Sequence, residues 1–224
     1  MTLARTVALH LRKDFRLEWR SKDAANSMLF FALLVVVVFA WAFDPLAEES
    51  RRIAGGIGSV ALLFATLVAL NQSWARELRN GVLDALRLAP ASPNALFLGK
   101  AFANFIFIAI VECLITPVFV VFYNLRVVGS GWQLILVAAL GTWALVVVGT
   151  FFSALSIRTR NRELMLPLIL FPISLPALLA MVMGATDILT GERVPIDWIK
   201  LLTVYGVVFT AVSLMLFEAV LNAE

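Results

Sequence analysis

Six long apolar runs constrain the fold of this chain more than any other feature of its sequence. Of its 224 residues, 62% are hydrophobic and 15% are charged, whereas a soluble domain carries about 25% charged residues. A run of about 20 apolar residues is long enough to cross the hydrocarbon core of a bilayer as an α-helix. The sequence therefore predicts an all-α integral membrane protein with a single domain, residues 1–224.

Short polar links separate the apolar runs. In chain order, the predicted spans cover roughly 24–43, 53–70, 101–123, 132–155, 164–183 and 198–220. The second span carries Gly55 and Ser59 four residues apart, and then Ala61, Ala65 and Ala69. Small residues on one face let two helix backbones approach closely in lipid, so we expect this face to pack against another helix. The alternative is that alanine is simply common here.

Prolines interrupt the fifth apolar run. Pro167, Pro172 and Pro176 each remove a backbone donor, so this helix is expected to kink or break. A polar loop over 184–197 is expected to follow it, and a polar turn over 44–52 is expected to join the first two spans.

The N-terminal segment, residues 1–23, has the pattern of an amphipathic helix. Apolar residues recur every four positions, at Leu3, Val7, Leu11 and Phe15. Most of the opposite side is basic, with Arg5, Arg12, Lys13, Arg16 and Arg20. This pattern favours a helix lying in the membrane interface, with Trp19 as an anchor, over a soluble N-terminal helix. The single histidine, His10, is then expected to be a surface residue of this helix.

The longest polar interruption after the N-terminus covers residues 74–100. Its first part predicts a short amphipathic helix over 75–88, because Leu78, Val82 and Leu86 recur on one face. Polar residues occupy most of the remaining positions, at Arg76, Glu77, Arg79, Asp84 and Arg87. Pro90 and Pro93 then bend the chain. An ordinary solvated loop is the alternative.

The distribution of lysine and arginine predicts the orientation. Thirteen of the eighteen lie in 1–23, 74–100 and 158–162, and five lie in the links that alternate with these segments. Because cytoplasmic loops carry the excess of basic residues, these three segments and both termini are predicted to be cytoplasmic. The basic residues line membrane edges, and no nucleic-acid partner is expected.

No catalytic or metal-binding motif is visible. A phosphate-binding loop is excluded at Gly99 and Lys100, because Asn94 stands where its first glycine belongs and Ala101 where its hydroxyl belongs. The chain is therefore not expected to hydrolyse ATP by itself. With one histidine and one cysteine, Cys113, it has neither paired metal ligands nor an intramolecular disulfide.

Glu112 is the exception in the apolar interior, halfway along the third span. A charged carboxylate there costs about 2.5–3.5 kcal/mol, so it should be protonated, paired or turned to a polar cavity. Asn104 precedes it by two turns on a similar face, and Pro117 follows it. Two interpretations remain open: part of a substrate path or subunit seam, or a protonated side chain hydrogen-bonded to a neighbouring helix.

The order of these elements, with a predicted cytoplasmic helix between the second and third spans, resembles the permease of ABC-2 exporters. That class typically carries an acidic residue, a Gly-Thr-Leu-Glu-like turn, Leu, Pro, and a Lys at the next span. The matching residues are Glu77, Gly81, Val82, Leu83, Asp84, Leu86, Pro90 and Lys100. Val82 departs from the usual hydroxyl residue and Asp84 from the usual glutamate.

Within that class the chain is most similar to the family of haem-exporter permeases that serve the cytochrome c maturation system. The similar segments are the basic start and first span at 11–31, the second span and following helix at 55–90, and the proline-rich span at 166–181. The likeness thus covers most of the chain.

This resemblance implies an ATPase partner on the cytoplasmic side of a bacterial inner membrane, with the 75–88 coupling helix in its groove. Arg76, Glu77 and Asp84 would make its polar contacts and Leu78, Val82 and Leu86 its apolar contacts. The resemblance also implies a second permease copy, other maturation subunits and a periplasmic haem chaperone.

Haem would be a substrate rather than a tightly bound cofactor, and ATP would bind the partner. Whether haem is moved or is released from the chaperone stays open. An ABC-2 permease for a lipid-linked glycan or a drug, and a membrane scaffold that transports nothing, are the rival interpretations.

Overall fold

A computed structural model describes residues 3–43, 48–79, 92–125, 127–156 and 162–222, and all the regular structure in these ranges is helical. The helices are α1 (Leu3–Ser21), α2 (Asp23–Ala42), α3 (Glu48–Arg79), α5 (Pro93–Phe122), α6 (Gly131–Ser156), α7 (Arg162–Thr190) and α8 (Ile196–Asn222). Among the described residues, six helices, α2 to α8, are long and apolar enough to cross a membrane. The predicted all-α fold with six spans is confirmed.

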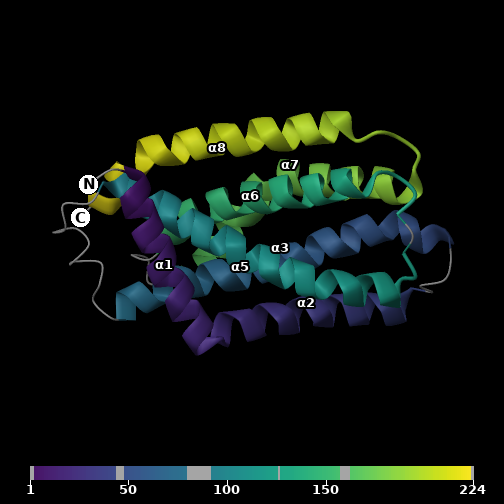
Figure 1. Ribbon diagram of the computed structural model, residues 1–224, viewed down its shortest axis with the longest axis horizontal. Coiled ribbons are helices and arrows are strands. Elements are labelled where there is room, and N and C mark those ends of the chain that lie inside the picture. Colours follow the sequence, from purple (N-terminus) through teal and green to yellow (C-terminus); the bar gives the residue numbers. More distant parts are fainter. Residues whose placement is uncertain (1–2, 44–47, 80–91, 126, 157–161, 223–224) are drawn as a thin grey trace.

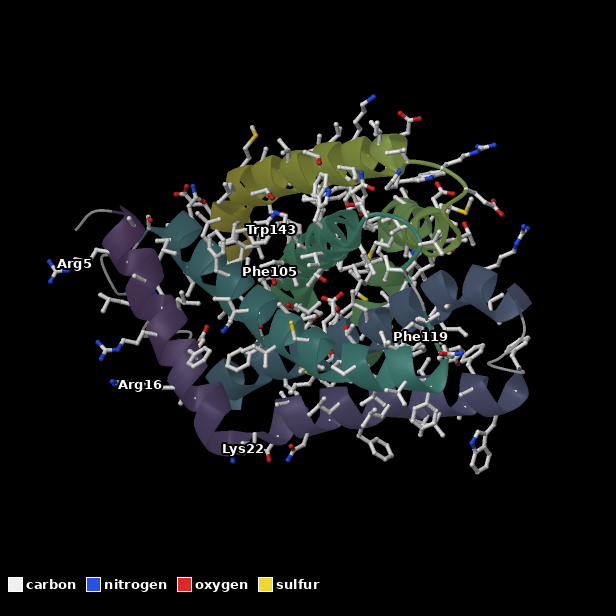
Figure 2. The ribbon with its side chains drawn as sticks, turned by 45° about the vertical axis from the view of Figure 1, so that its right-hand side comes forward. Arg5, Arg16, Lys22, Phe105, Phe119 and Trp143 are labelled. Atoms are coloured by element: carbon white, nitrogen blue, oxygen red, sulfur yellow. The ribbon has the colours of Figure 1, made fainter. Side chains whose placement is uncertain are left out.

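The six long helices lie side by side, and α1 crosses one end of the bundle (Figure 1). The N- and C-termini both lie at that end (Figure 1), as an even number of spans requires. Arg5 and Arg16 of α1 are exposed and point away from the bundle (Figure 2). A helix is present at Leu3–Ser21, and its role as an amphipathic helix in a membrane interface stays a prediction.

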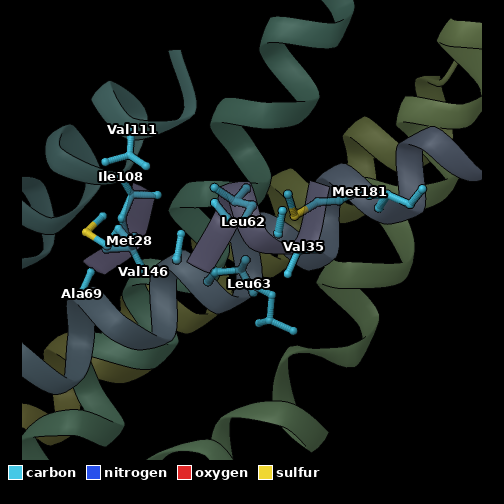
Figure 3. Packing of buried hydrophobic residues seen from close by; sticks show 14 of the residues in the cluster. Met28, Val35, Leu62, Leu63, Ala69, Ile108, Val111, Val146 and Met181 are labelled. Carbon is cyan, nitrogen blue, oxygen red and sulfur yellow. The ribbon is translucent and has the colours of Figure 1, made fainter. Parts of the chain in front are cut away.

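The centre of the bundle is α6, which packs against α3, α5, α7 and α8. From Ala144 to Thr150 every residue of this helix is buried. Figure 3 shows the apolar core around it, where Met28 of α2, Ala69 of α3 and Ile108 of α5 lie close to Val146. Exposed apolar side chains lie instead on the outer faces of α2, α5, α7 and α8, as expected for surfaces that contact lipid.

The small-residue face of α3 packs as predicted. Ser59, Ala61, Ala65 and Ala69 are all buried. At Gly55 an added Cβ would lie 2.7 Å from Oγ1 of Thr186 and 2.9 Å from its backbone nitrogen. A side chain at Gly55 would therefore push α3 and α7 apart.

Several helix ends differ from the prediction. The expected turn at 44–52 is wrong in its second half, because α3 begins at Glu48, and residues 44–47 lie outside the described part of the chain. The third span begins at Pro93 instead of 101. Pro93 occupies the first turn of the helix, where a backbone N–H has no partner within the helix and can be missing. The Ser92 hydroxyl caps the helix by accepting a hydrogen bond from the Ala95 nitrogen at 3.3 Å.

The proline-rich helix α7 does not break, and it continues through the first half of the predicted 184–197 loop to Thr190. Side chains bond to carbonyls near the prolines: the Tyr205 hydroxyl donates to the Ile173 carbonyl at 2.7 Å, and the Ser174 hydroxyl donates to the Phe171 carbonyl at 3.3 Å. Both of these carbonyls lie between Pro167 and Pro176, so neighbouring side chains support the helix in the stretch that the prolines interrupt.

Adjacent glycines of α3 allow a matched test of the α3–α7 contact. Gly55→Ala is expected to destabilise the protein by about 1–3 kcal/mol, because the new Cβ meets backbone that cannot yield cheaply. Gly56→Ala is the control, since its Cβ would lie 3.8 Å from the nearest atom, Cγ1 of Val182. The measurement is thermal unfolding of the purified chain in detergent; equal melting temperatures would refute the contact.

Candidate functional site

The predicted coupling helix at 75–88 is only partly described. Its first residues, Ala75 to Arg79, form the end of α3, which continues from the second span without a break. The side chains of Arg76, Glu77 and Leu78 lie outside the described residues, as do the entire residues Gly81, Val82, Leu83, Asp84 and Leu86. Their contacts with an ATPase stay a prediction. What the structure describes is how the chain enters and leaves this segment.

Aromatic side chains hold both flanks of the segment. Trp74 of α3 is 2% exposed, and its ring centroid lies 6.2 Å from that of Phe217 on α8. On the other flank, the ring centroid of Phe97 of α5 lies 5.1 Å from that of Phe217. The two ends of the predicted coupling segment therefore meet in one apolar cluster with the end of α8.

A buried cation lies beside this aromatic cluster. Lys100 of α5 is 1% exposed, and its Nζ lies 4.6 Å from the centre of the Trp74 ring. Nζ also lies 3.4 Å from Oδ2 of Asp14 on α1. A buried charge needs such partners, because its desolvation is otherwise uncompensated. The contact joins α1, α3 and α5 at the end of the bundle where the termini lie.

A cavity of about 40 Å³ adjoins Lys100, with Asp14, Ser73 and Asn104 among its lining residues. This volume is enough for a water molecule and far below the roughly 300 Å³ of a pocket for a drug-sized ligand. The cavity therefore suits hydration of the buried pair rather than binding of a large ligand.

The remaining contact between α1 and α5 is close. An added Cβ at Gly99 would lie 2.6 Å from the Cβ of His10, and the rings of Phe15 and Phe107 stack with centroids 5.1 Å apart. The expectation that His10 is a surface residue is therefore wrong, because this residue is partly buried against α5. Only glycine at position 99 allows α1 to approach this closely.

Hydrogen bonds between polar side chains join α5 to α6 at two levels of the described bundle. Nδ2 of Asn104 donates to Oγ1 of Thr150 at 3.2 Å, and Oγ1 of Thr142 donates to Oε2 of Glu112 at 3.1 Å. Each helix advances eight residues between the two levels, so both bonds belong to one antiparallel register, with fully buried Ile108 between them. The structure supports the interpretation of Glu112 as a side chain bonded to a neighbouring helix.

Glu112 also lines a cavity of about 60 Å³ between α2, α3 and α5, with mostly apolar neighbours such as Val36 and Leu62. Pro117 lies inside α5 one turn further on, and the helix continues past it to Phe122.

A role of Glu112, Asn104 or Pro117 in a substrate path stays a prediction, as does a role of Pro167, Pro172 and Pro176. Within the described ranges, no group of three or more His, Cys, Asp or Glu side chains could hold a metal ion.

The sequence of the chain matches one known family along nearly its whole length. The family model described as CcmB protein matches residues 5–223. The chain belongs to the CcmB family. It is 32% identical over 209 residues to heme exporter protein B of Rhodobacter capsulatus, covering 93% of this chain and 94% of that protein. It is 30% identical over 169 residues to the protein of the same name from Paracoccus denitrificans, covering 75% and 77% of the two chains. A third, from Escherichia coli, is 36% identical over 104 residues, 46% of each chain.

Membership in the CcmB family confirms the resemblance drawn from the sequence segments. Together with the six apolar helices, it shows that the chain is a multi-pass membrane protein of the heme exporter permease type.

Sequence reasoning missed the acidic partner of Lys100. Asp14 follows Val7 by seven residues, His10 by four and Leu11 by three, so it lies on the apolar face of the N-terminal helix. A carboxylate on that face was the available signal that a cation lies opposite it in this CcmB-family chain. The identity of the cation depends on helix packing, because Asp14 and Lys100 are 86 residues apart.

A double-mutant cycle tests the Glu112–Thr142 bond. Glu112→Leu and Thr142→Val, made singly and together, are expected to show a coupling energy of about 0.6–1.7 kcal/mol, the range for hydrogen bonds between membrane helices. Thr203→Val replaces Thr142→Val in the control cycle, because the Thr203 hydroxyl bonds to the carbonyl of Ile199 in its own helix. Unfolding in mixed micelles gives the energies. Strict additivity in the first cycle would show that the bond contributes nothing.

Proposed function

We propose that this chain is the membrane permease subunit of an ABC exporter complex that handles haem in the maturation of c-type cytochromes. The observation that carries the proposal is the match over nearly the whole chain to the CcmB family and to a relative named heme exporter protein B. The six-span bundle is the architecture that such a permease needs.

The energy source is a separate ATPase subunit. This chain carries no phosphate-binding loop, and residues 75–88 resemble the coupling helix with which ABC-2 permeases contact their ATPase. The proposed contacts are the polar Arg76, Glu77 and Asp84 and the apolar Leu78, Val82 and Leu86. Closure of the ATPase dimer would displace this segment.

The continuity of α3 supports a mechanical mechanism. One helix extends from Glu48 through the membrane to Arg79, inside the predicted coupling segment. Along its length α3 packs against α2, α5, α6 and α7. A displacement applied at Arg79 would therefore act on most of the bundle without passing through a loop.

Haem is handled at a surface between subunits. The cavities beside Lys100 and Glu112, about 40 and 60 Å³, are much smaller than the roughly 300 Å³ of a drug-sized pocket. We therefore place the haem-handling surface between this chain and a second permease copy or another maturation subunit. A periplasmic haem chaperone would act on the far side.

The proposed location is the bacterial inner membrane, with both termini in the cytoplasm. The three segments with thirteen of the eighteen basic residues support this orientation. Trp41 and Trp132 are largely exposed, at the last turn of α2 and the first turn of α6, where tryptophan commonly lies at the far membrane interface.

Complementation of a deletion strain tests the proposal. The unaltered chain should restore covalent haem on c-type cytochromes, and Glu77→Lys should insert normally but give only the level of the deletion strain, because the ATPase contact is reversed in charge. Glu192→Lys is the control, since Glu192 is an exposed carboxylate in the link between α7 and α8, and this link lies at the end of the bundle opposite the termini (Figure 1). The measurements are haem staining of cytochromes and immunoblotting of the membrane fraction.

Normal holo-cytochrome in the deletion strain would contradict the proposed function, and a normal level in Glu77→Lys would contradict the coupling role. In a coupling-deficient strain, haem accumulating on the periplasmic chaperone would indicate that ATP drives release, and an empty chaperone would indicate that ATP drives transport.

A further inference from the structure

The buried pair of Lys100 and Asp14 gives α1 one defined position on the bundle. Asp14 is mostly buried, with 16% of its side chain exposed; its Oδ2 faces Lys100 at 3.4 Å and its Oδ1 faces Lys13 at 3.3 Å. Replacing a buried ion pair by apolar residues is often neutral or stabilising. The pair is therefore better explained by what it positions than by the stability it contributes.

The position of the pair connects α1 to both flanks of the predicted coupling segment. Trp74 is the last described side chain before that segment, and Ser92 is the first described residue after it. Lys100 lies two turns into α5, contacts the Trp74 ring and bonds to Asp14. One ammonium group thus links the incoming flank, the outgoing flank and the helix that crosses the end of the bundle (Figure 1).

The packing of α1 makes this link important. This helix packs chiefly against α5 and more weakly against α2. Besides the ion pair, the contact with α5 includes the close approach of His10 to Gly99 and the stacking of the Phe15 ring on that of Phe107. Apolar contacts alone tolerate sliding, whereas a charge pair in a buried site has one register.

We propose that Lys100 is a positioning residue that makes α1 move together with the two flanks of the coupling segment. The inference rests on the proposed function, because it assumes that an ATPase displaces that segment. Lys100 acts through Asp14 and Trp74, and it has no contact with substrate or nucleotide in this role. Displacement of α3 and α5 would then carry α1, with its exposed arginines, across the membrane surface as one unit.

The decisive variant removes both charges. In Lys100→Met with Asp14→Asn, neither charge of the buried pair remains, and Lys13, which loses the carboxylate of Asp14, is 35% exposed to solvent. The chain should therefore reach the membrane at its normal level and bind the ATPase. Coupling should fail: ATP hydrolysis by the purified complex should continue, whereas holo-cytochrome c should fall several-fold. The exposed pair Arg52–Glu192, 2.7 Å apart, is the matched control, and Arg52→Gln with Glu192→Gln should change neither quantity.

A disulfide staple provides the second arm. His10→Cys and Gly99→Cys allow a disulfide between α1 and α5. An added Cβ at Gly99 would lie 2.6 Å from the Cβ of His10, so this variant separates the two helices until the Cβ atoms reach the usual ~3.8 Å. Each stapled chain is therefore compared with its own reduced form, which carries the same side chains. Cys113→Ala removes the native thiol. Oxidation should leave the activity of the otherwise unaltered chain at the level of its reduced form, and it should raise holo-cytochrome c in the variant without charges above the level of that variant's reduced form.

The outcomes separate the two ideas. Normal holo-cytochrome c in the variant without charges, loss of activity when the staple closes in the unaltered chain, or no restoration by the staple would each overturn the positioning role. If the variant without charges fails to accumulate, the staple in the unaltered chain still decides. Glu77→Lys is measured in parallel: if it is defective while the Lys100 variants are normal, only the positioning role fails, and if both are normal, the proposed coupling fails as well.

Discussion

The structure depends on one constraint: within the bilayer, backbone N–H and C=O groups must be satisfied by the chain itself. Continuous helices meet this demand, and they extend past the apolar runs that cross the membrane. Beyond the apolar runs, α3 continues to Arg79 and α7 continues to Thr190. The helix α7 also continues through its three prolines, and the hydroxyls of Ser174 and Tyr205 donate to carbonyls between Pro167 and Pro176. The same continuity makes α3 suitable for transmitting a displacement applied at Arg79.

Two sets of contacts between polar or charged side chains join the helices of the described bundle. In the α5–α6 contact, Asn104 and Glu112 bond to threonines in one antiparallel register, which holds these two helices together. At the end with the termini, Lys100 joins α1, α3 and α5 through Asp14 and Trp74. We interpret the first set as fixing the bundle and the second as connecting it to the segment on which an ATPase would act.

The existence and number of spans could be predicted from the sequence, because a run of about 20 apolar residues has few alternatives to a membrane helix. The small-residue face of Gly55 and Ser59 was predictable for a similar reason, since its spacing describes one helix by itself. The ends of α3, α5 and α7 could not be predicted, because the helical hydrogen bonds of the backbone continue from the apolar runs into polar sequence, as they do at 48–52 in α3. Nor could the partners of Lys100 and Glu112 be predicted: they depend on how separate helices pack, and periodicity within one helix carries no information on that. The family resemblance supplied the function, which no single motif in the chain specifies.

The central claim is that the end of the bundle with the predicted coupling segment faces the cytoplasm and meets an ATPase. Cysteine labelling tests it most directly, with Cys113→Ala as background and Ser92→Cys at the exposed start of α5. The account predicts that a membrane-impermeant maleimide reacts with Ser92→Cys in inverted vesicles and not in intact spheroplasts, and that the co-expressed ATPase slows the reaction. Val194 is 63% exposed in the link between α7 and α8, which lies at the opposite end of the bundle (Figure 1), and Val194→Cys should react from the other side of the membrane. Labelling of Ser92→Cys from the outside of spheroplasts would contradict the account.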